Sequence, residues 1–339
     1  MEATPRVSIL LPARDAAATL EEALASLVAQ TLPDWECLVA DDGSRDATAD
    51  IGARWARADG RIRLIRAPAP QGIVAALVRA AREARAPYLA RQDADDRSLP
   101  GRLERSLALL QGEARLGAVA TQVRFFPAPP GESGWGHYGE WLNAAITPAE
   151  IERDLWVESP LPHPAVLMRR SAYLGSGGYR DVPWPEDYDL WLRMHVNGWR
   201  FAKVPEVLYE WRLHPGRLTL RDAHYSADAF LACKLHHLAP RLRRRRIFIW
   251  GAGRDGRRLG RALAARGFGI SAFVDIDPRK IGRTRLGRPV LAPEALGERN
   301  SAGGALLLVA VGTRGARTLI RARLAQLGWS EPEDFLCLH

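Results

Sequence analysis

The sequence predicts an α/β protein with two domains, of which the larger, N-terminal one contains a mainly parallel β-sheet. Three observations support this prediction. Apolar strand-like segments alternate with helix-like segments over roughly the first 125 residues, an order typical of a parallel sheet with helices on both faces. An arginine-rich run, Arg241–Arg246, then precedes a second strand–helix alternation that begins at Ile247. The length of 339 residues also fits two domains.

The elements of the first alternation follow from hydrophobic periodicity. Leu20, Leu24 and Leu27 recur at the spacing of one helical face, and the strands are short apolar runs. We expect strands at Val7–Leu11, Glu36–Ala40, Ile62–Ile65, Tyr88–Ala90 and Ala118–Phe125. Helices are expected at Thr19–Gln30, from about Asp46, at Ile73–Ala84 and at Pro100–Leu110. Ligands of such sheets bind beyond the carboxyl ends of the strands.

The periodic pattern ends after the fifth strand. From Phe126 to about Pro160 turn-forming residues are frequent, and we expect a long loop that serves as a lid or binding segment. A mixed region up to about Leu238 contains one predicted helix, Glu186–Val196. We therefore divide the chain into an N-terminal domain, a basic linker and a C-terminal domain, at residues 1–240, 241–246 and 247–339.

The C-terminal domain begins with a strand, Ile247–Trp250, followed by a glycine-rich turn and a helix, Arg257–Ala265. A second strand, Ile270–Val274, ends in an acidic residue. This order favours phosphate binding at the helix N-terminus and marks a second nucleotide site, at Gly251, Gly253, Gly256 and Asp275. A third strand and a last helix are expected at Leu306–Val311 and up to about Leu327. A binding or docking role, a degenerate structural role and an independent reaction all remain open.

Composition excludes several classes of protein. With 47% hydrophobic and 26% charged residues, the chain is expected to be globular and to bury a core. Its three cysteines lie far apart, which favours reduced thiols over disulfides or a cysteine metal site. Because no signal peptide and no apolar run of membrane-spanning length is evident, we expect a cytoplasmic protein.

The formal net charge of +9 comes almost entirely from arginine, a bias that indicates a GC-rich genome more than a nucleic-acid function. No nucleic-acid motif or aromatic interleaving accompanies it, so we expect no nucleic-acid partner. The Arg241–Arg246 run has two interpretations. It contacts anionic lipid headgroups or an acidic partner, peripherally at the inner face of the membrane, or it is a solvated linker.

Three carboxylates stand within four positions after the strand Tyr88–Ala90, namely Asp93, Asp95 and Asp96. Carboxylates this close disfavour one another's ionisation, and a divalent cation reverses that penalty. Mg²⁺ and Mn²⁺ take oxygen ligands from one or two carboxylates together with substrate phosphates and water. The segment therefore predicts a metal–diphosphate site that holds Mn²⁺ or Mg²⁺. The alternative is a turn in which one aspartate caps the next helix.

Three further segments carry side chains that fit such a site. The run Asp41–Ser44 ends the second strand, where a carboxylate accepts hydrogen bonds from a nucleobase or ribose, or else shapes a turn. Glu186 and Asp187 open a helix, where acids suit the helix dipole, and either is a potential general base. Arg212 and His214 alternate on one face of an extended segment, and arginine matches phosphate oxygens.

Taken in chain order, these motifs resemble the family 2 glycosyltransferases over roughly residues 5–220. The resemblance rests on Val7–Pro12, Thr19–Leu27, Gln30-Thr31, Asp41–Thr48, Gln92–Asp96 and Glu186-Asp187. It implies the nucleotide-sugar-binding GT-A fold and inverting sugar transfer by a single in-line displacement. The Gln-x-x-Arg-Trp motif of processive synthases is not evident. Where many relatives have an asparagine after the first strand, this chain has Arg14-Asp15, which puts the donor-base contacts there in doubt.

The resemblance also implies roles for individual residues. Pro12, Asp41 and Asp42 would contact the nucleobase and ribose, Asp93 the ribose and metal, and Asp95 the metal directly. Asp187 would be the catalytic base, and Asp96 would support the metal site. Arg212 and His214 would close the site over the diphosphate. The acceptor side would include His163 and Glu186. In the C-terminal domain, Phe273–Val290 resembles small Rossmann-like domains that accompany sugar-nucleotide modifying enzymes.

The leading functional prediction is a metal-dependent inverting glycosyltransferase of surface polysaccharide or glycolipid biosynthesis. Its donor would be a nucleoside-diphosphate sugar, with a UDP-sugar favoured, and its acceptor a hydroxyl on a saccharide or lipid-linked molecule. Two alternatives remain. One is a nicotinamide-dependent sugar-nucleotide oxidoreductase that acts through the C-terminal domain, and the other is a non-catalytic nucleotide-sugar-binding protein.

Overall fold

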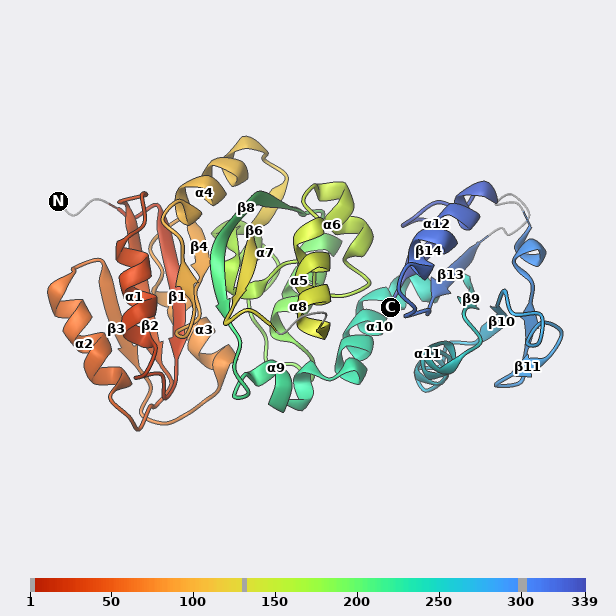
Figure 1. Ribbon diagram of the computed structural model, residues 1–339, viewed down its shortest axis with the longest axis horizontal. Helices are drawn as coiled ribbons and strands as arrows, with labels where there is room; N and C mark the ends of the chain where they lie inside the picture. The colour runs from red at the N-terminus through yellow and green to blue at the C-terminus, as the bar shows by residue number, and fades with distance from the viewer. Residues whose placement is uncertain (1–3, 130–132, 298–303) are drawn as a thin grey trace. The chain divides into compact units, whose positions relative to one another are not determined.

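The computed structural model describes residues 4–129, 133–297 and 304–339. They form two compact units (Figure 1). The first consists of Met1–Glu152 and Pro160–Asp222, and the second of Arg153–Ser159 and Ala223–His339. Each unit has its own β-sheet.

The first unit contains an eight-stranded sheet in the order β3-β2-β1-β4-β7-β6-β8-β5. β1 to β4 pair in parallel, whereas β7 in the middle of the sheet and β5 at its edge run antiparallel to their neighbours. The predicted mainly parallel sheet is therefore confirmed. The strands are β1 Val7–Ala13, β2 Trp35–Asp41, β3 Ile62–Arg66, β4 Tyr88–Arg91, β5 Arg97–Ser98, β6 Leu116–Phe126, β7 Leu167–Arg169 and β8 Arg200–Arg212.

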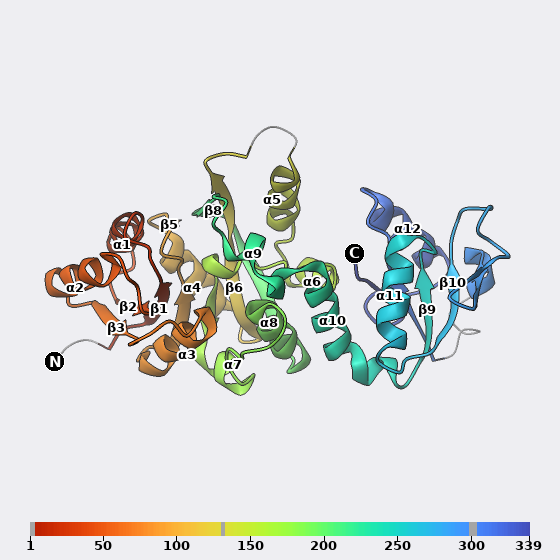
Figure 2. The ribbon, with the colours of Figure 1, turned by 90° about the horizontal axis from the view of Figure 1, so that it is seen from below.

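Helices cover both faces of this sheet, as the strand–helix alternation predicts. The helices α1 and α2 lie on one face and α3 on the other (Figure 2). The α-helices of this unit, with α6 at its border, are α1 Leu20–Val28, α2 Thr48–Ala58, α3 Ile73–Glu83, α4 Arg102–Gly112, α5 Gly134–Ala144, α6 Pro148–Asp154, α7 Arg170–Gly175, α8 Glu186–Val196 and α9 Leu218–Arg221.

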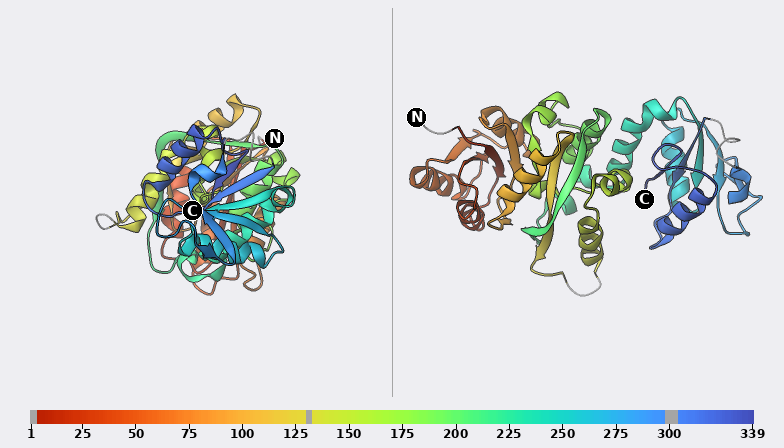
Figure 3. Two further views of the ribbon diagram at one scale, coloured as in Figure 1. Left: turned by 90° about the vertical axis from the view of Figure 1, so that its right-hand side faces the viewer. Right: turned by 90° about the horizontal axis from the view of Figure 1, so that it is seen from above.

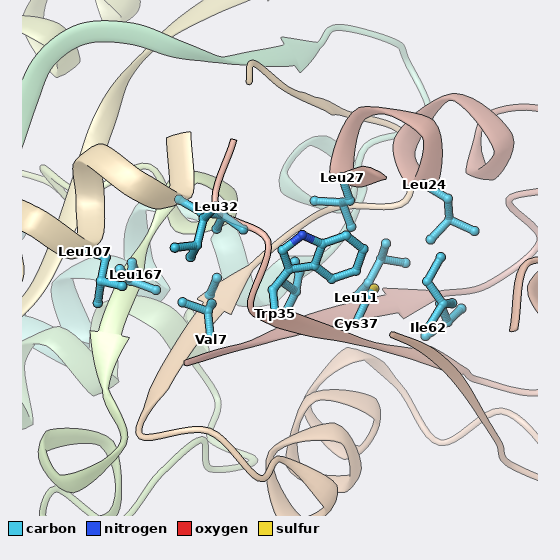
Figure 4. Packing of buried hydrophobic residues seen from close by; sticks show 14 of the residues in the cluster. Val7, Leu11, Leu24, Leu27, Leu32, Trp35, Cys37, Ile62, Leu107 and Leu167 are labelled. Atoms are coloured by element: carbon cyan, nitrogen blue, oxygen red, sulfur yellow. The ribbon is translucent and has the colours of Figure 1, made fainter. Parts of the chain in front are cut away.

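The core lies between the sheet and the helices α1, α2 and α4 (Figure 4). Trp35 of β2 is 2% exposed and packs among apolar side chains from the strands and from α1, including Leu27 and Leu11. Burial of aromatic and branched side chains on this scale fixes the strand register, because a slip by one residue would turn these side chains to the opposite face. The strand ends, and the carboxylates that follow them, are placed by this packing.

The expectation of a long loop from Phe126 to Pro160 is wrong in part, because two helices, α5 and α6, form there. The Ser133 hydroxyl caps α5 by accepting a hydrogen bond from the Gly136 N–H at 3.2 Å. Asn143 ties the helix to β6 by exchanging two hydrogen bonds with the Val123 backbone. These tertiary contacts outweigh the low helix propensity of the glycines. Residues 130–132 of the segment lie outside the described residues.

The second unit contains a six-stranded sheet in the order β11-β12-β10-β9-β13-β14. Among the described strands of this unit, only β11 and β12 pair in antiparallel, and the two crossover helices α11 and α12 lie on opposite faces of the sheet (Figure 3). The strands are β9 Arg246–Trp250, β10 Ile270–Val274, β11 Thr284–Arg285, β12 Arg288–Leu291, β13 Ala305–Val309 and β14 Phe335–Cys337. The helices are α10 Ala227–Leu242, α11 Arg254–Ala264 and α12 Ala316–Gln326. Short 3-10 turns are η1 His163–Ala165 in the first unit, and η2 Ala223–Tyr225 and η3 Pro293–Leu296 in the second.

The compact units divide at Asp222 rather than at residue 240, where the charge run suggested a boundary. The physical reason is that α10 packs with the second unit. Its buried Lys234 donates hydrogen bonds to the carbonyls of Val157 at 2.6 Å and Leu338 at 3.0 Å. The arginine run is also not a free linker, because Arg241 and Arg245 both donate to the Glu333 carbonyl.

Lys234 gives the second unit a predictable pH dependence. Burial lowers the pKa of Lys234 from 10.5 to about 8. Between these two values the unfolded chain binds more protons than the folded one, so the free energy of unfolding rises with pH in this window. From about pH 7.5 to about pH 9.5 we expect a gain on the order of 2 kcal/mol that Lys234→Met lacks. Chemical denaturation of both proteins measures the difference, and identical pH profiles would contradict the assignment.

The three cysteines Cys37, Cys233 and Cys337 are buried and free, as their spacing predicts. Within the described ranges, every helix is too short or too polar to cross a bilayer.

Candidate active site

The turn after β4 carries the three clustered aspartates, and a buried polar network holds its shape. The Gln92 side chain donates to the carbonyls of Asp93 at 3.0 Å and Asp96 at 3.1 Å, which closes the turn. Arg102, which is 1% exposed, donates to Gln92 Oε1 at 3.0 Å and to the Arg91 carbonyl at 2.7 Å. Since buried polar groups are costly to leave unpaired, this network fixes the turn in one conformation.

The aspartates of the turn differ in their partners. Their carboxylate oxygens lie within 4.8 Å of one another. Asp93 forms an ion pair with buried Arg91 at 2.6 Å, and Asp95 Oδ2 lies 2.9 Å from His214 Nε2. Asp96 accepts hydrogen bonds from the Tyr209 hydroxyl at 3.0 Å and the Arg212 N–H at 2.7 Å. The structure thus brings Asp93 and Asp95, the two predicted metal ligands, together with His214, which the sequence had placed at the diphosphate.

Burial and mutual repulsion disfavour the charged forms of two of these carboxyls. Desolvation, and then the negative charge of Asp93, raises the pKa of Asp95. Desolvation and both neighbouring aspartates raise the pKa of Asp96 well above its ordinary value. A cation within reach of the cluster would relieve this repulsion, because an opposite charge favours the ionised form. The donor set of hard carboxylate oxygens with one imidazole fits Mn²⁺ or Mg²⁺.

Arg212 contacts other residues of the protein, and its predicted contact with a phosphate stays a prediction. Its Nε donates to the Asp95 carbonyl at 2.7 Å, and its guanidinium forms an ion pair with Glu22 of α1. The same guanidinium stacks 4.3 Å from the centre of the Phe126 ring. In this conformation Arg212 links the turn of three aspartates after β4 to α1, while His214 two residues later faces Asp95.

The nucleobase end of the predicted site lies after β2 and β3. A cavity of about 710 Å³ opens there, lined by Gly43, Ser44, Arg45, Arg66 and residues 67–70. Arg66 lies 3.4 Å from the buried carboxylate of Asp41. Both oxygens of Asp42 accept backbone N–H groups, from Gln71 at 2.9 Å and Gly72 at 2.8 Å. Asp42 therefore orders the cavity wall, and Pro12 at the end of β1 is half-buried.

Gly43 and Asp15 explain why the cavity has its shape. Gly43 has a φ of +67°, and a Cβ there would lie 2.7 Å from the backbone of Ala69. Only glycine permits that approach without strain. Asp15 accepts a hydrogen bond from the Arg45 N–H at 2.8 Å and so fixes the loop from the other side.

A second polar cluster forms at the start of α8. Ligating atoms of His163, Glu186 and Asp187 lie within 4.8 Å of one another. His163 Nε2 lies 2.7 Å from the Tyr179 hydroxyl, and its Nδ1 lies 3.7 Å from Glu186. Burial, and then the nearby positive charge of Arg91, lowers the pKa of His163 well below its ordinary value. Arg91 thus faces both clusters, because it also pairs with Asp93.

Comparisons with known proteins decide the family. Residues 8–174 match the family described as Glycosyl transferase family 2. The chain is 32% identical over 243 residues to the putative glycosyltransferase EpsE of Bacillus subtilis, a match that spans 69% of this chain and 84% of EpsE. The chain belongs to glycosyltransferase family 2. The resemblance deduced from the ordered motifs is therefore confirmed, and the protein is an enzyme of the glycosyltransferase class.

Further relatives and solved structures agree. The succinoglycan biosynthesis protein ExoU of Rhizobium meliloti is 30% identical over 216 residues, which is 60% of each protein. A Pyrobaculum calidifontis mannosyltransferase, solved with GDP-Man and Mn²⁺, superposes with a TM-score of 0.53 at 22% identity. S. aureus TarS, solved with UDP-GlcNAc, superposes with a TM-score of 0.55 at 16% identity. The matches span 71% and 70% of this chain, but only 65% and 66% of those structures. These likenesses show the fold.

Sequence reasoning missed several residues that support the turn after β4. Arg91, Arg102 and Tyr209 are all nearly fully buried and contact this turn. One signal was available for the first of them, since an arginine at the end of an otherwise apolar strand is unusual unless it is paired. The roles of Arg102 and Tyr209 depend on contacts across 10 to 116 positions in the chain, which no local pattern reveals.

The glycine-rich turn of the second unit has a structural explanation for most of its residues. A Cβ on Gly256 would lie 1.7 Å from the Gly251 carbonyl oxygen, so the helix packs closely on the turn. Asp275 accepts hydrogen bonds from the Ala252 N–H at 2.8 Å and from Lys280 Nζ at 3.1 Å. Only Gly253 leaves open space. The second nucleotide site stays a prediction, and its acid, Asp275, is already bound by Lys280 within the protein.

Proposed function

We propose that this glycosyltransferase moves a sugar from a nucleoside-diphosphate sugar to an acceptor hydroxyl, with inversion and with the help of Mn²⁺ or Mg²⁺. One observation carries the proposal. Three clustered carboxylates follow β4, one of them 2.9 Å from a histidine, and a further carboxylate, Asp187, lies in a separate cluster at the start of α8. Such a transfer requires one group that stabilises the charge of the leaving diphosphate and a separate carboxylate that accepts the proton of the acceptor hydroxyl.

The residues that would hold the cation are Asp95 and Asp93, with His214 as an additional ligand. Asp96 would support them through its hydrogen bonds to Tyr209 and Arg212. When bound, the cation would offset the charge that develops on the departing diphosphate. Asp93 needs less from the cation than Asp95, because Arg91 already neutralises it.

The donor nucleotide would occupy the cavity after β2 and β3, where Arg66 and Asp41 lie at its wall. We propose that Asp41, Asp42 and Pro12 set the shape and polarity of this end. A UDP-sugar is the favoured donor. The solved neighbours support a nucleotide sugar in general, since one is a complex with GDP-Man and another with UDP-GlcNAc.

In the transfer step, the Asp187 carboxylate removes the proton from the acceptor hydroxyl as its oxygen attacks the anomeric carbon. Asp187 lies in the first turn of α8, where the helix dipole favours its charged form. Glu186 and His163 face the acceptor side, and neutral His163 is held by Tyr179. Attack opposite the leaving diphosphate inverts the anomeric centre.

We propose that the acceptor is a saccharide or lipid-linked molecule of surface polysaccharide or glycolipid assembly, at the cytoplasmic face of the membrane and in peripheral contact with it. Relatives named for succinoglycan and O-antigen biosynthesis support this context. An oxidoreductase that acts through the second unit is not favoured, because the clustered carboxylates lie in the first unit. A non-catalytic nucleotide-sugar binder is opposed by the presence of Asp187, which binding alone does not need.

The test is donor hydrolysis and transfer with a panel of UDP-, GDP- and dTDP-sugars, each with Mn²⁺, Mg²⁺ or EDTA. Release of one nucleoside diphosphate that EDTA abolishes is the expected result. NMR of the product bond, where an acceptor is found, should show the opposite anomeric configuration to the donor. Nucleotide release that is equally fast in EDTA would overturn metal dependence. Binding of NAD alone, without a response to any diphosphate, would move the active site to the second unit.

A further inference from the structure

The net positive charge of this chain is confined to the second unit. The first unit contains 26 Lys and Arg and 28 Asp and Glu, a net charge of −2. The second unit contains 22 Lys and Arg but only 11 Asp and Glu, a net charge of +11, and together the two give the +9 of the whole chain. A genome-wide preference for arginine acts on both units alike, so it does not explain this asymmetry. An asymmetry of this kind indicates an anionic partner.

Part of this positive charge lies on one excursion of the chain, residues 276–289 between β10 and β12, where exposed arginines stand beside exposed apolar side chains. This segment holds five basic residues and one acid, Asp277. Its outward side chains include Ile276, which is 72% exposed, and Leu286, which is 42% exposed. Arg279, Arg283 and Arg288 are exposed beside them. We call residues 276–289 the basic hairpin segment.

Two features of the basic hairpin segment oppose its own stability. Arg285 and Arg288 stand directly opposite each other in the β11–β12 pair, where like charges repel. Among the described residues, neither they nor Arg283 form an ion pair. The turn between the strands also places Leu286 at a φ of +49°, a conformation that asparagine or glycine adopts far more readily. Part of the Leu286 side chain packs near Gly260 of α11, and the rest faces solvent.

An anionic surface with an apolar layer beneath it would remove both penalties. Arginines near anionic lipid headgroups lose their mutual repulsion, and each contributes to binding. An apolar side chain at the tip of a turn enters the acyl boundary, where its burial is favourable. We propose that the basic hairpin segment docks the second unit on a membrane rich in anionic phospholipids.

A nucleic acid would satisfy the charge but not the exposed apolar side chains. The basic hairpin segment contains no aromatic residue for base stacking, which single-stranded binders use.

The arginine run Arg241–Arg246 is a weaker candidate for the membrane contact, because Arg241 and Arg245 already donate hydrogen bonds to backbone carbonyls of the same unit. This inference deepens the proposed membrane location. Sugar transfer to a soluble acceptor would survive its failure, so the two are tested separately.

The experiment is co-sedimentation of the full chain with vesicles of phosphatidylglycerol and phosphatidylcholine, or of phosphatidylcholine alone. We expect binding to the anionic vesicles that falls as salt is added. The variant R283Q/R288Q should bind about 25-fold more weakly, since each arginine near an anionic surface is worth about fivefold. It should remain folded because it relieves a repulsion. Leu286→Asn, which suits the turn, should lower the binding that persists at high salt.

The matched control is R261Q/R266Q, which removes two exposed arginines of the same unit, one in α11 and one two residues after its end. It should lose less than about threefold, because charges farther from the surface are screened. Equal losses in the two double variants would overturn the proposal in favour of general basicity, and equal binding to both vesicle types would overturn it outright. If duplex DNA or RNA displaces the protein from vesicles, and R283Q/R288Q also binds that nucleic acid more weakly, the basic hairpin segment binds a nucleic acid and the proposal is overturned.

Discussion

Asp187→Asn is expected to lower kcat by about 10²- to 10⁴-fold while donor binding changes by less than about twofold. The amide keeps the size and hydrogen-bonding reach of the carboxylate at the start of α8 but does not accept a proton at neutral pH. Because the acceptor hydroxyl must lose its proton as it attacks, the loss falls on the chemical step. Initial rates with saturating donor, together with calorimetric binding of the nucleoside diphosphate, separate the two effects.

Asp181→Asn is the matched control, since it makes the same chemical change at an exposed position six residues earlier. It should leave kcat within about twofold. Glu186→Gln discriminates between the two acids at the start of the helix. If Glu186→Gln abolishes turnover and Asp187→Asn does not, the base is Glu186, and the pair it forms with His163 would then orient the catalytic group. If turnover is unchanged in both variants, neither Asp187 nor Glu186 is the catalytic base, and the assignment is wrong.

The strand ends and the cluster of aspartates after β4 could be predicted from the sequence because both are local. Apolar runs define the strands, and Asp93, Asp95 and Asp96 stand within four positions, whereas a cation bound there stays a prediction. The helix Glu186–Val196 is confirmed at both ends, since acids open it and periodic apolar residues continue it. In each case, neighbouring residues carry the whole signal.

The supports of the site could not be predicted because they depend on long-range pairing. Arg212 was expected to reach a phosphate, yet it is bound by Glu22, 190 positions away. Tyr209 reaches Asp96 only because β8 lies beside β5 and β6 in the sheet. The helix α5 was missed for a similar reason. Its glycines predict a loop, and contacts of its Asn143 with β6 decide otherwise.

Asp95→Asn is expected to abolish the cation-dependent part of nucleoside-diphosphate binding and to lower kcat/KM on the order of 10³-fold. Asp95 lacks a full counter-charge in the protein, so it has most to gain from a cation. Neutralising it also removes the repulsion that raises the pKa of Asp96. The metal-free variant should therefore melt at the same temperature as the wild type or slightly higher, but it should lose the stabilisation that Mn²⁺ confers on the wild type.

Asp93→Asn is predicted to behave oppositely in the absence of metal, which makes the pair a sharp test. Asp93 neutralises Arg91, whose side chain is 1% exposed, and a buried guanidinium without its partner is costly. Asp93→Asn should thus lower the melting temperature, whereas Asp95→Asn should not. Asp50→Asn, on the exposed face of α2, controls for loss of one negative charge. Thermal melts with and without Mn²⁺ measure all three. If Asp95→Asn destabilises the metal-free protein as much as Asp93→Asn does, Asp95 has a structural role and the cation lies elsewhere.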